Sequence, residues 1–347
     1  MAESRKLPYF TALLLYSTQL LGQNFGSSYD FLLKETNARI AALGGVNASL
    51  RDEDVQLGFG NPAAINGKMA KSVGMTVNPG LGGTVQYNLA YADSGKKMGP
   101  WFAGLQFLDY GKLRESDVNG VRLGEFQASQ YAIGFGTSRK KGNFHLGIYG
   151  KWIGFQVFGD QAYALAFDLG AHYQHPKKSM SYGLTIRNLG ATLRKFEGVE
   201  QSMPLPLNIQ ASLSYKLEHM PLRLSINGFY FQETDIQYLD PSDPGKLDPN
   251  GNLVREKKKI TEQIARHLGL GGEFLLHRSF HLRFGYNHLR RKELRTDAGA
   301  GLTGFSLGCM INTKPLNLSY TYSGWQPSGG QHFITLNCRL NQFYNKN

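Results

Sequence analysis

The stretch LNIQASLSYKL, residues 207–217, alternates strictly between apolar and polar side chains. Successive side chains of a β-strand point to opposite faces, so this stretch predicts a strand with one apolar and one polar face. The pattern recurs in FHLGIYGKW (144–152), LRLSIN (222–227) and FHLRFGYN (280–287). The chain therefore reads as a series of strands whose two faces differ in chemistry.

About fourteen such segments follow one another from residue 71 onward. Most are about 9–15 residues long, whereas globular strands average ~5–6 residues and tilted membrane strands need ~9–11. We expect strands at 71–79, 82–92, 99–110, 125–138, 142–156, 160–175, 179–190, 206–218, 220–233, 262–276, 279–291, 299–312, 314–324 and 330–342. Their length favours a membrane barrel over a soluble sandwich.

The connections between these segments give an independent signal. Every second connection is short, and the long ones, Gly111–Gly124, Ala191–Leu205 and Thr234–Thr261, all fall in the other set. Short periplasmic turns and long extracellular loops are typical of outer-membrane barrels. The sequence thus predicts an all-β fold, a single-chain antiparallel transmembrane β-barrel of about 14 strands over residues 71–347. Its apolar side chains should face lipid and its polar ones the lumen.

Composition excludes several other classes of protein. The 347 residues carry a net charge of +12, but only 18% are charged, too few for a disordered tail or a coiled coil. The basic residues are dispersed and no recognition motif accompanies them, so we expect no nucleic-acid partner. Two cysteines, Cys309 and Cys338, cannot build a disulfide framework or a four-ligand zinc site. With one strand between them they should be free thiols facing lipid.

The N-terminus has the outline of an export signal. Arg5 and Lys6 precede an apolar run from Phe10 to Leu21, which is too short to span a bilayer. We interpret residues 1–23 as a signal peptide that directs the chain to the outer membrane. The alternative is a buried N-terminal helix.

Residues 24–70 do not alternate and are rich in small side chains, so they predict a lumenal plug or a periplasmic strap. Asp52-Glu53-Asp54 could ligate Ca²⁺, but the EF-hand spacing is absent. We favour an acidic cluster that anchors the plug to basic side chains on the polar strand faces. The candidate partners are Lys151, Arg187, Arg223 and Arg283.

The same segment carries a family resemblance. Tyr29-Asp30-Phe31, Ala38-Arg39, Ala42-Leu43-Gly44-Gly45, Asp52 to Asp54 and Asn61-Pro62-Ala63 resemble the N-terminal signature of the FadL-like barrels of Bacteroidota. Within that group the segment is most similar to the PorQ family of the type IX secretion system. The motifs match only in residues 29–66; over the rest of the chain the likeness lies in length and strand number.

The resemblance implies a non-enzymatic outer-membrane barrel without cofactor, metal or catalytic residue. It would anchor a PorZ-like surface protein in the attachment complex with PorU and PorV, which processes secreted cargo and attaches anionic lipopolysaccharide. Its plug motif would be structural: Gly44, Gly45, Asn61, Pro62 and Ala63. The alternative is a passive transporter of hydrophobic small molecules, as in the fatty-acid branch. Such a transporter should have an apolar pocket behind residues 29–66 and a lateral opening in the wall.

Other motifs were weighed against simpler interpretations. Gly304–Gly308 matches the G-x-S-x-G nucleophile elbow, with His281 as the nearest candidate base for Ser306, which would make a lipid-acting rim enzyme. The motif lies inside an alternating strand with no helix after it, so we favour a strand. Gly269, Gly271 and Gly272 predict room for a plug rather than a phosphate loop. His172 and His175 predict hydrogen-bonded rim histidines rather than metal ligands.

Overall fold

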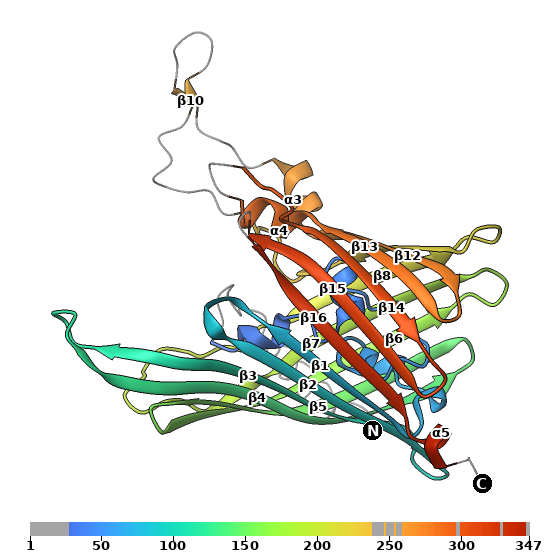
Figure 1. Cartoon of the computed structure of the whole chain (residues 1–347), viewed down its shortest axis with the longest axis horizontal. Coiled ribbons are helices and arrows are strands. Elements are labelled where there is room, and N and C mark those ends of the chain that lie inside the picture. The colour runs from blue at the N-terminus through green and yellow to red at the C-terminus, as the bar shows by residue number, and fades with distance from the viewer. Residues whose placement is uncertain are drawn as a thin grey trace, which may run out of the picture.

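The computed structural model describes residues 28–237, 246–247, 253–254, 259–295, 299–326 and 329–344. Fourteen antiparallel strands of this part of the chain form a closed barrel, as expected from the alternation (Figure 1). The barrel strands are β1 Ser72–Pro79, β2 Val85–Gly95, β3 Gly99–Ser116, β4 Arg122–Lys141, β5 Phe144–Val157, β6 Asp160–Gln174, β7 Met180–Arg194, β8 Asn208–Lys216, β9 Leu222–Gly228, β12 Leu268–His277, β13 Phe280–Asn287, β14 Phe305–Asn312, β15 Leu316–Gln326 and β16 Gly329–Arg339. A separate two-stranded sheet pairs β10 Lys246–Leu247 with β11 Leu253–Val254.

The alternation places polar side chains inside the barrel and apolar ones outside. In β8, the polar residues Asn208, Gln210, Ser212 and Ser214 are all buried. In β5, Phe144 and Ile148 are 53% and 46% exposed on the outer face, while His145, Tyr149 and Lys151 are buried. A soluble protein shows the opposite arrangement, with apolar side chains in the core and polar ones in water.

The two rims of the barrel differ. At the rim where β1 begins and β16 ends, six short turns join β2 to β3, β4 to β5, β6 to β7, β8 to β9, β12 to β13 and β14 to β15. We call this rim the turn end and the opposite rim the loop end. The segments 195–207, 229–267 and 288–304 all connect strands at the loop end.

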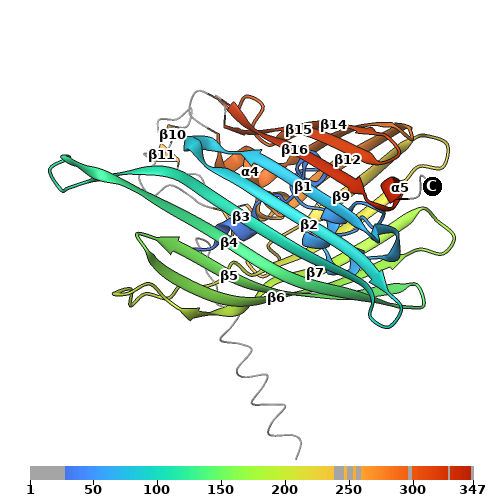
Figure 2. The same cartoon turned by 60° about the horizontal axis from the view of Figure 1, so that its bottom comes forward.

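One predicted loop is wrong. Gly111–Gly124 is mostly strand, because β3 continues to Ser116 and β4 starts at Arg122. The neighbouring strands stop earlier: β2 pairs with β3 only as far as Asp109, and β5 pairs with β4 only from Ala128. A two-stranded hairpin therefore extends beyond the wall at the loop end (Figures 1 and 2). The sequence suggested a loop because Gly111 interrupts the alternation. With φ +69° it forms a bulge within the strand instead of ending it.

Two segments expected as strand begin or end as helices. α3 (Ile260–Arg266) precedes β12, and α4 (His288–Glu293) follows β13. In α3 the ion pair Glu262–Arg266 joins positions four residues apart, which supports a helical turn. In α4 the Asn287 side chain accepts a hydrogen bond from the Arg290 amide and caps the helix. Among the described residues, no helix has the length and apolarity needed to cross a membrane.

The N-terminal segment lies inside the barrel as a chain of short helices. Their bounds are η1 Asp30–Leu33, α2 Ala38–Ala42, η2 Val55–Phe59, η3 Pro62–Ala64 and η4 Gly67–Met69. Residues 35–66 of this segment, here called the plug, are mostly buried. The two other short helices, η5 Leu81–Gly83 and α5 Asn341–Tyr344, do not belong to the N-terminal segment. The signal-peptide prediction for residues 1–23 and part of the predicted loop Thr234–Thr261 lie outside the described residues.

Candidate functional site

The Asn61-Pro62-Ala63 turn fits against the barrel wall. The Asn61 carboxamide accepts from the Ala63 amide at 2.9 Å and donates to the Ala48 carbonyl at 2.6 Å, which fixes η3 to the rest of the plug. The facing strands carry glycine: a Cβ at Gly147 would lie 2.2 Å from the Pro62 carbonyl carbon. No side chain fits at that distance, so the plug backbone touches the wall backbone there.

Gly44 and Gly45 shape the other end of the plug. Both have positive φ, +89° and +94°, which a side chain would strain. Asn287 donates to the Gly44 carbonyl at 2.9 Å from the wall. Among the predicted wall glycines, Gly271 opens space for Leu43, whereas a Cβ at Gly272 would meet Phe284 and one at Gly269 has only ordinary contacts.

The acidic cluster pairs with arginine, and one partner is on a barrel strand as expected: Glu53 pairs with Arg339 of β16. Arg339 is not among the four predicted partners. Arg39, from the plug itself, pairs with Asp52 at 2.8 Å and with Glu273 of β12 at 2.8 Å. Two of the predicted partners, Arg223 and Arg283, pair with Glu273 at 2.8 and 3.1 Å. One buried wall carboxylate thus holds three guanidinium groups, and Arg39 connects it to the plug.

The other two predicted partners lie elsewhere. Lys151 pairs with Asp168 at 2.8 Å and also bonds Asn188, all three buried in the wall. The Asn188 amide donates to Asp168 Oδ1, one of the two oxygens that Lys151 contacts, at 2.7 Å. Arg187 donates to the Leu32 carbonyl of η1 at 3.0 Å. Neither basic side chain reaches the acidic cluster, because both lie nearer the loop end of the barrel.

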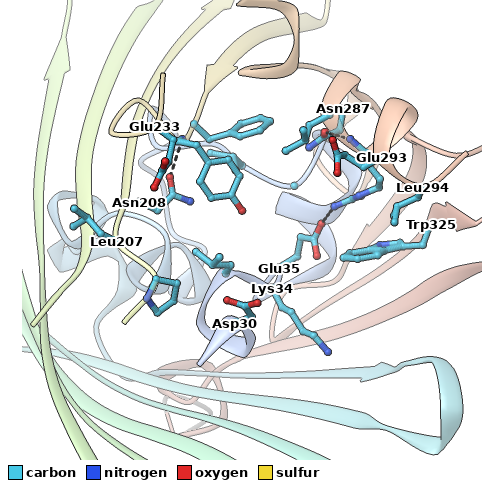
Figure 3. Close-up of a pocket in the computed structure, with 18 of the residues that line it drawn as sticks. Asp30, Lys34, Glu35, Leu207, Asn208, Glu233, Asn287, Glu293, Leu294 and Trp325 are labelled. Atoms are coloured by element: carbon cyan, nitrogen blue, oxygen red, sulfur yellow. Dashed lines mark hydrogen bonds and ion pairs between the residues drawn. The ribbon is translucent and has the colours of Figure 1, made fainter. Parts of the chain in front are cut away.

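A cavity of about 500 Å³ lies on the loop-end side of the plug. Leu33, Val46, Leu207, Phe229 and Tyr230 contribute apolar surface to its lining. Figure 3 shows Lys34 and Glu35 of the N-terminal segment in the cavity, with Asn208 and Glu233 across it from Trp325. The lining is amphipathic, with a few charged groups set among apolar side chains, as in many small-molecule sites.

Arg290 is the main charged group of this loop-end cavity. It pairs with Glu35, donates to the Ser323 hydroxyl at 2.8 Å and stacks on the Trp325 ring at 4.3 Å. Burial lowers the pKa of the Lys34 ammonium, an effect that Glu35 opposes. Burial also raises the pKa of Glu293, against the effect of Arg266. Both shifts favour the uncharged forms of groups that line the cavity.

The wall beside the loop-end cavity contains an irregular seam. β7 pairs with β8 only from Met180 to Arg187, and its remaining residues pair with β6 alone. Opposite that part of β7 lies the segment MPLPL (203–207). Its two prolines have no amide hydrogen, so the segment cannot continue the ladder. Side chains bridge the seam instead: Asn188 donates to the Pro206 carbonyl at 2.8 Å, and Thr192 to that of Met203.

A second cavity, of about 680 Å³, lies on the turn-end side of the plug. The acidic cluster and the arginines around Glu273 form its inner wall, and the turns after β12 and β14 form its rim. The plug therefore separates two cavities inside the barrel. Sequence reasoning missed the residues that make this division, Glu35, Glu273 and Arg290, because each lies in a segment with no motif of its own.

The remaining motifs take structural roles. Ser306 is the second residue of β14, and its hydroxyl hydrogen-bonds that of Ser323 at 2.9 Å. It lies opposite Gly285 in the register, four residues along β13 from His281, or roughly 13 Å. The structure therefore does not bring this serine and histidine together.

The two predicted rim histidines each make hydrogen bonds to the backbone. His172 hydrogen-bonds the Ser49 carbonyl at 3.0 Å, and His175 accepts from the Lys177 and Lys178 amides. Cys309 and Cys338 are free thiols on β14 and β16. Within the described parts of the chain, no three His, Cys, Asp or Glu side chains come together as metal ligands.

Comparison with solved structures identifies the fold of this chain. No family model matches the chain, and no curated protein matches it. The toluene transporter TbuX of Ralstonia pickettii is similar at 13% identity, with a TM-score of 0.52 over 88% of this chain and 99% of that chain. The toluene transporter TodX of Pseudomonas putida is similar at 11% identity, with a TM-score of 0.51 over 88% of this chain and 96% of that chain.

A FadL homologue of Pseudomonas aeruginosa is also similar, at 12% identity and a TM-score of 0.48, over 88% of this chain and 98% of that chain. At the identities of TbuX and TodX, the similarity establishes the fold. The chain has the fold of a closed barrel of fourteen antiparallel strands, similar to that of TbuX and TodX.

Proposed function

We propose that this chain is an outer-membrane barrel that takes up a small hydrophobic molecule in its loop-end cavity. The membrane location is supported by the outward apolar side chains and by the difference between short turns and long loops. In this orientation the turn end faces the periplasm and the loop end faces outward.

The observation that carries the proposal is the amphipathic cavity beside the MPLPL seam. Pro206 and Leu207 of the seam line the cavity themselves. The two sides of the seam are joined by a few side-chain hydrogen bonds instead of a continuous backbone ladder, so separating them requires less free energy. The seam therefore supplies the lateral opening that a hydrophobic transporter needs. The described neighbours of the same fold, TbuX and TodX, are toluene transporters, which supports an apolar ligand of that size.

Filling the cavity tests this function. Leu33 lies in the cavity lining, and Leu33→Trp adds a bulky ring there. We expect toluene binding by the purified barrel to weaken at least about tenfold, the equivalent of 1.4 kcal/mol. Leu193→Trp is the control, because Leu193 is exposed on the outer side of β7. Equal toluene binding by the two variants would contradict a ligand site in this cavity.

A second function, anchoring a surface partner for type IX secretion, is favoured by a different observation. The hairpin of β3 and β4 extends outward beyond its neighbours and carries the exposed apolar residues Val118, Val121 and Leu123 at and near its tip. The resemblance of residues 29–66 to the PorQ family supports the same reading. The partner would be a PorZ-like protein in a complex with PorU, PorV and anionic lipopolysaccharide.

Shortening the hairpin tests the anchoring role. Replacing residues 114–125 by Asn-Gly joins Leu113 to its cross-strand partner Phe126 through a two-residue turn. We expect near-complete loss of a co-purifying surface protein from native outer membranes, measured by mass spectrometry of a detergent pull-down. Lys96→Gln/Lys97→Gln, at the turn end, should leave recovery unchanged. Recovery of the same protein with the shortened hairpin would reject this surface as the anchor.

A further inference from the structure

The two cavities of the barrel carry opposite charge. Acidic residues Asp30, Glu35, Glu233 and Glu293 line the loop-end cavity against Lys34 and Arg290. The turn-end cavity has seven basic and three acidic side chains in its lining, a formal charge of +4. Glu273, directly behind Arg39, reduces this to +3. The basic side chains of the turn-end cavity therefore outnumber the carboxylates that could pair with them.

The ion pairs of the turn-end cavity show which basic groups remain available. Arg39, Arg223 and Arg283 are engaged with Glu273, and Arg339 pairs with Glu53. The three other basic residues, Lys68, Arg278 and Lys314, form no ion pair with any carboxylate that the structure describes. These three are the exposed cations of the cavity lining.

These three residues contribute to the cavity lining from three separate elements. Lys68 comes from η4, Arg278 from the turn between β12 and β13, and Lys314 from the turn between β14 and β15. Asn312, which donates to the Arg278 carbonyl at 3.3 Å, is in the same lining. Cations that converge on one hollow repel each other unless an anion joins them.

We propose that the turn-end cavity binds a phosphate group through Lys68, Arg278 and Lys314. A phosphate has several acceptor oxygens and can take charge-assisted hydrogen bonds from three cations at once. The phosphate comes from a lipid headgroup at the membrane surface or from a free phosphate compound. This site is separated from the hydrophobic-ligand cavity by the plug, so it does not depend on the proposed transport function.

The test measures binding of inorganic pyrophosphate to the detergent-solubilised full chain by calorimetry. Lys68→Gln/Arg278→Gln/Lys314→Gln should weaken binding at least about tenfold, because three charge-assisted bonds are lost. The control, Lys140→Gln/Lys141→Gln/Lys178→Gln, removes the same charge from exposed turn-end residues outside the cavity. Its binding should equal that of the native chain. Heat-modified migration in electrophoresis verifies that both variants form the barrel.

Native mass spectrometry with added phosphatidylglycerol distinguishes the two sources of phosphate. Retention of phosphatidylglycerol by the native chain, lost in the cavity variant and displaced by pyrophosphate, supports a lipid headgroup. Pyrophosphate binding without lipid retention supports a free phosphate compound. Equal binding by the cavity variant and the control, or no binding of either probe to the native chain, overturns the proposal.

Discussion

Glu273→Gln is expected to loosen the plug inside the closed barrel. The substitution removes the one wall carboxylate that holds Arg39, Arg223 and Arg283, and leaves three guanidinium groups close together and largely buried. Removing one partner of a buried ionic group costs about 3–5 kcal/mol, because the remaining charge is desolvated without compensation. The ladder of the wall does not depend on this side chain, so the cost falls on the attachment of the plug.

Limited proteolysis measures this loosening. Arg51 is half-buried and donates to the Ala63 carbonyl within the plug in the native chain. It should become a trypsin site within minutes, and single-channel conductance across planar bilayers should rise. Glu125→Gln is the matched control, because Glu125 makes the same kind of pairs with Lys112 and Arg122 on the exposed hairpin. Exposed pairs contribute only about 0–1 kcal/mol. A Glu273→Gln chain as resistant to trypsin as the Glu125→Gln chain would show that this network does not hold the plug.

Asp168→Ala is expected to destabilise the wall itself by about 3–5 kcal/mol. The substitution leaves the buried Lys151 ammonium without a carboxylate partner and removes the acceptor of the Asn188 amide. Asn188 has φ +60° and lies where the β6–β7 register shifts, so it helps to set the bulge beside the seam. Urea unfolding in lipid, followed by tryptophan fluorescence, measures the loss.

The double variant Lys151→Met/Asp168→Leu separates charge from packing. It removes both ions and keeps a similar apolar volume, so most of the lost stability should return. A second comparison is Asp160→Ala, which removes a pair with Arg194 at the surface and should leave stability close to that of the native chain. If the double variant is as unstable as Asp168→Ala alone, the Lys151–Asp168 charge balance is not the source of the effect.

The fold could be predicted because barrel strands repeat one physical rule many times. Each strand has to present apolar side chains to one side and polar ones to the other, and segments such as 207–217 record that rule residue by residue. Strand ends were harder to predict, since helix α3 and the Gly111 bulge depend on local pairing rather than on the alternation.

The site could be predicted only in part. The acidic cluster indicated ionic attachment of the plug, yet the residue that organises it, Glu273, looks like any other polar position of an alternating strand. Its role depends on strands β9, β12 and β13 lying side by side with the plug between them and the opposite wall, which is a property of the closed barrel. Arg39 belongs to the motif that carries the family resemblance, but its position in the sequence does not indicate that it pairs with both the plug and the wall.

The plug is also bonded to the last strands of the chain. The Ala38 amide donates to the Thr335 hydroxyl of β16 at 2.8 Å, and the Thr321 hydroxyl of β15 donates to the Ala38 carbonyl at 2.6 Å. Thr335 in turn shares a hydrogen bond with Thr76 of β1, across the strand pair that closes the barrel. These contacts join residues almost 300 positions apart in the chain, and contacts of such separation form late in folding.

The order of assembly follows from these contacts. A segment that touches wall backbone at Gly147, and whose helix α2 is bonded to β15 and β16, has no route into a finished barrel through either rim. The plug has to lie inside the partly closed sheet before β16 pairs with β1. The N-terminal segment thereby acts as a template around which the strands close, and a chain that lacks it should close its barrel slowly or not at all.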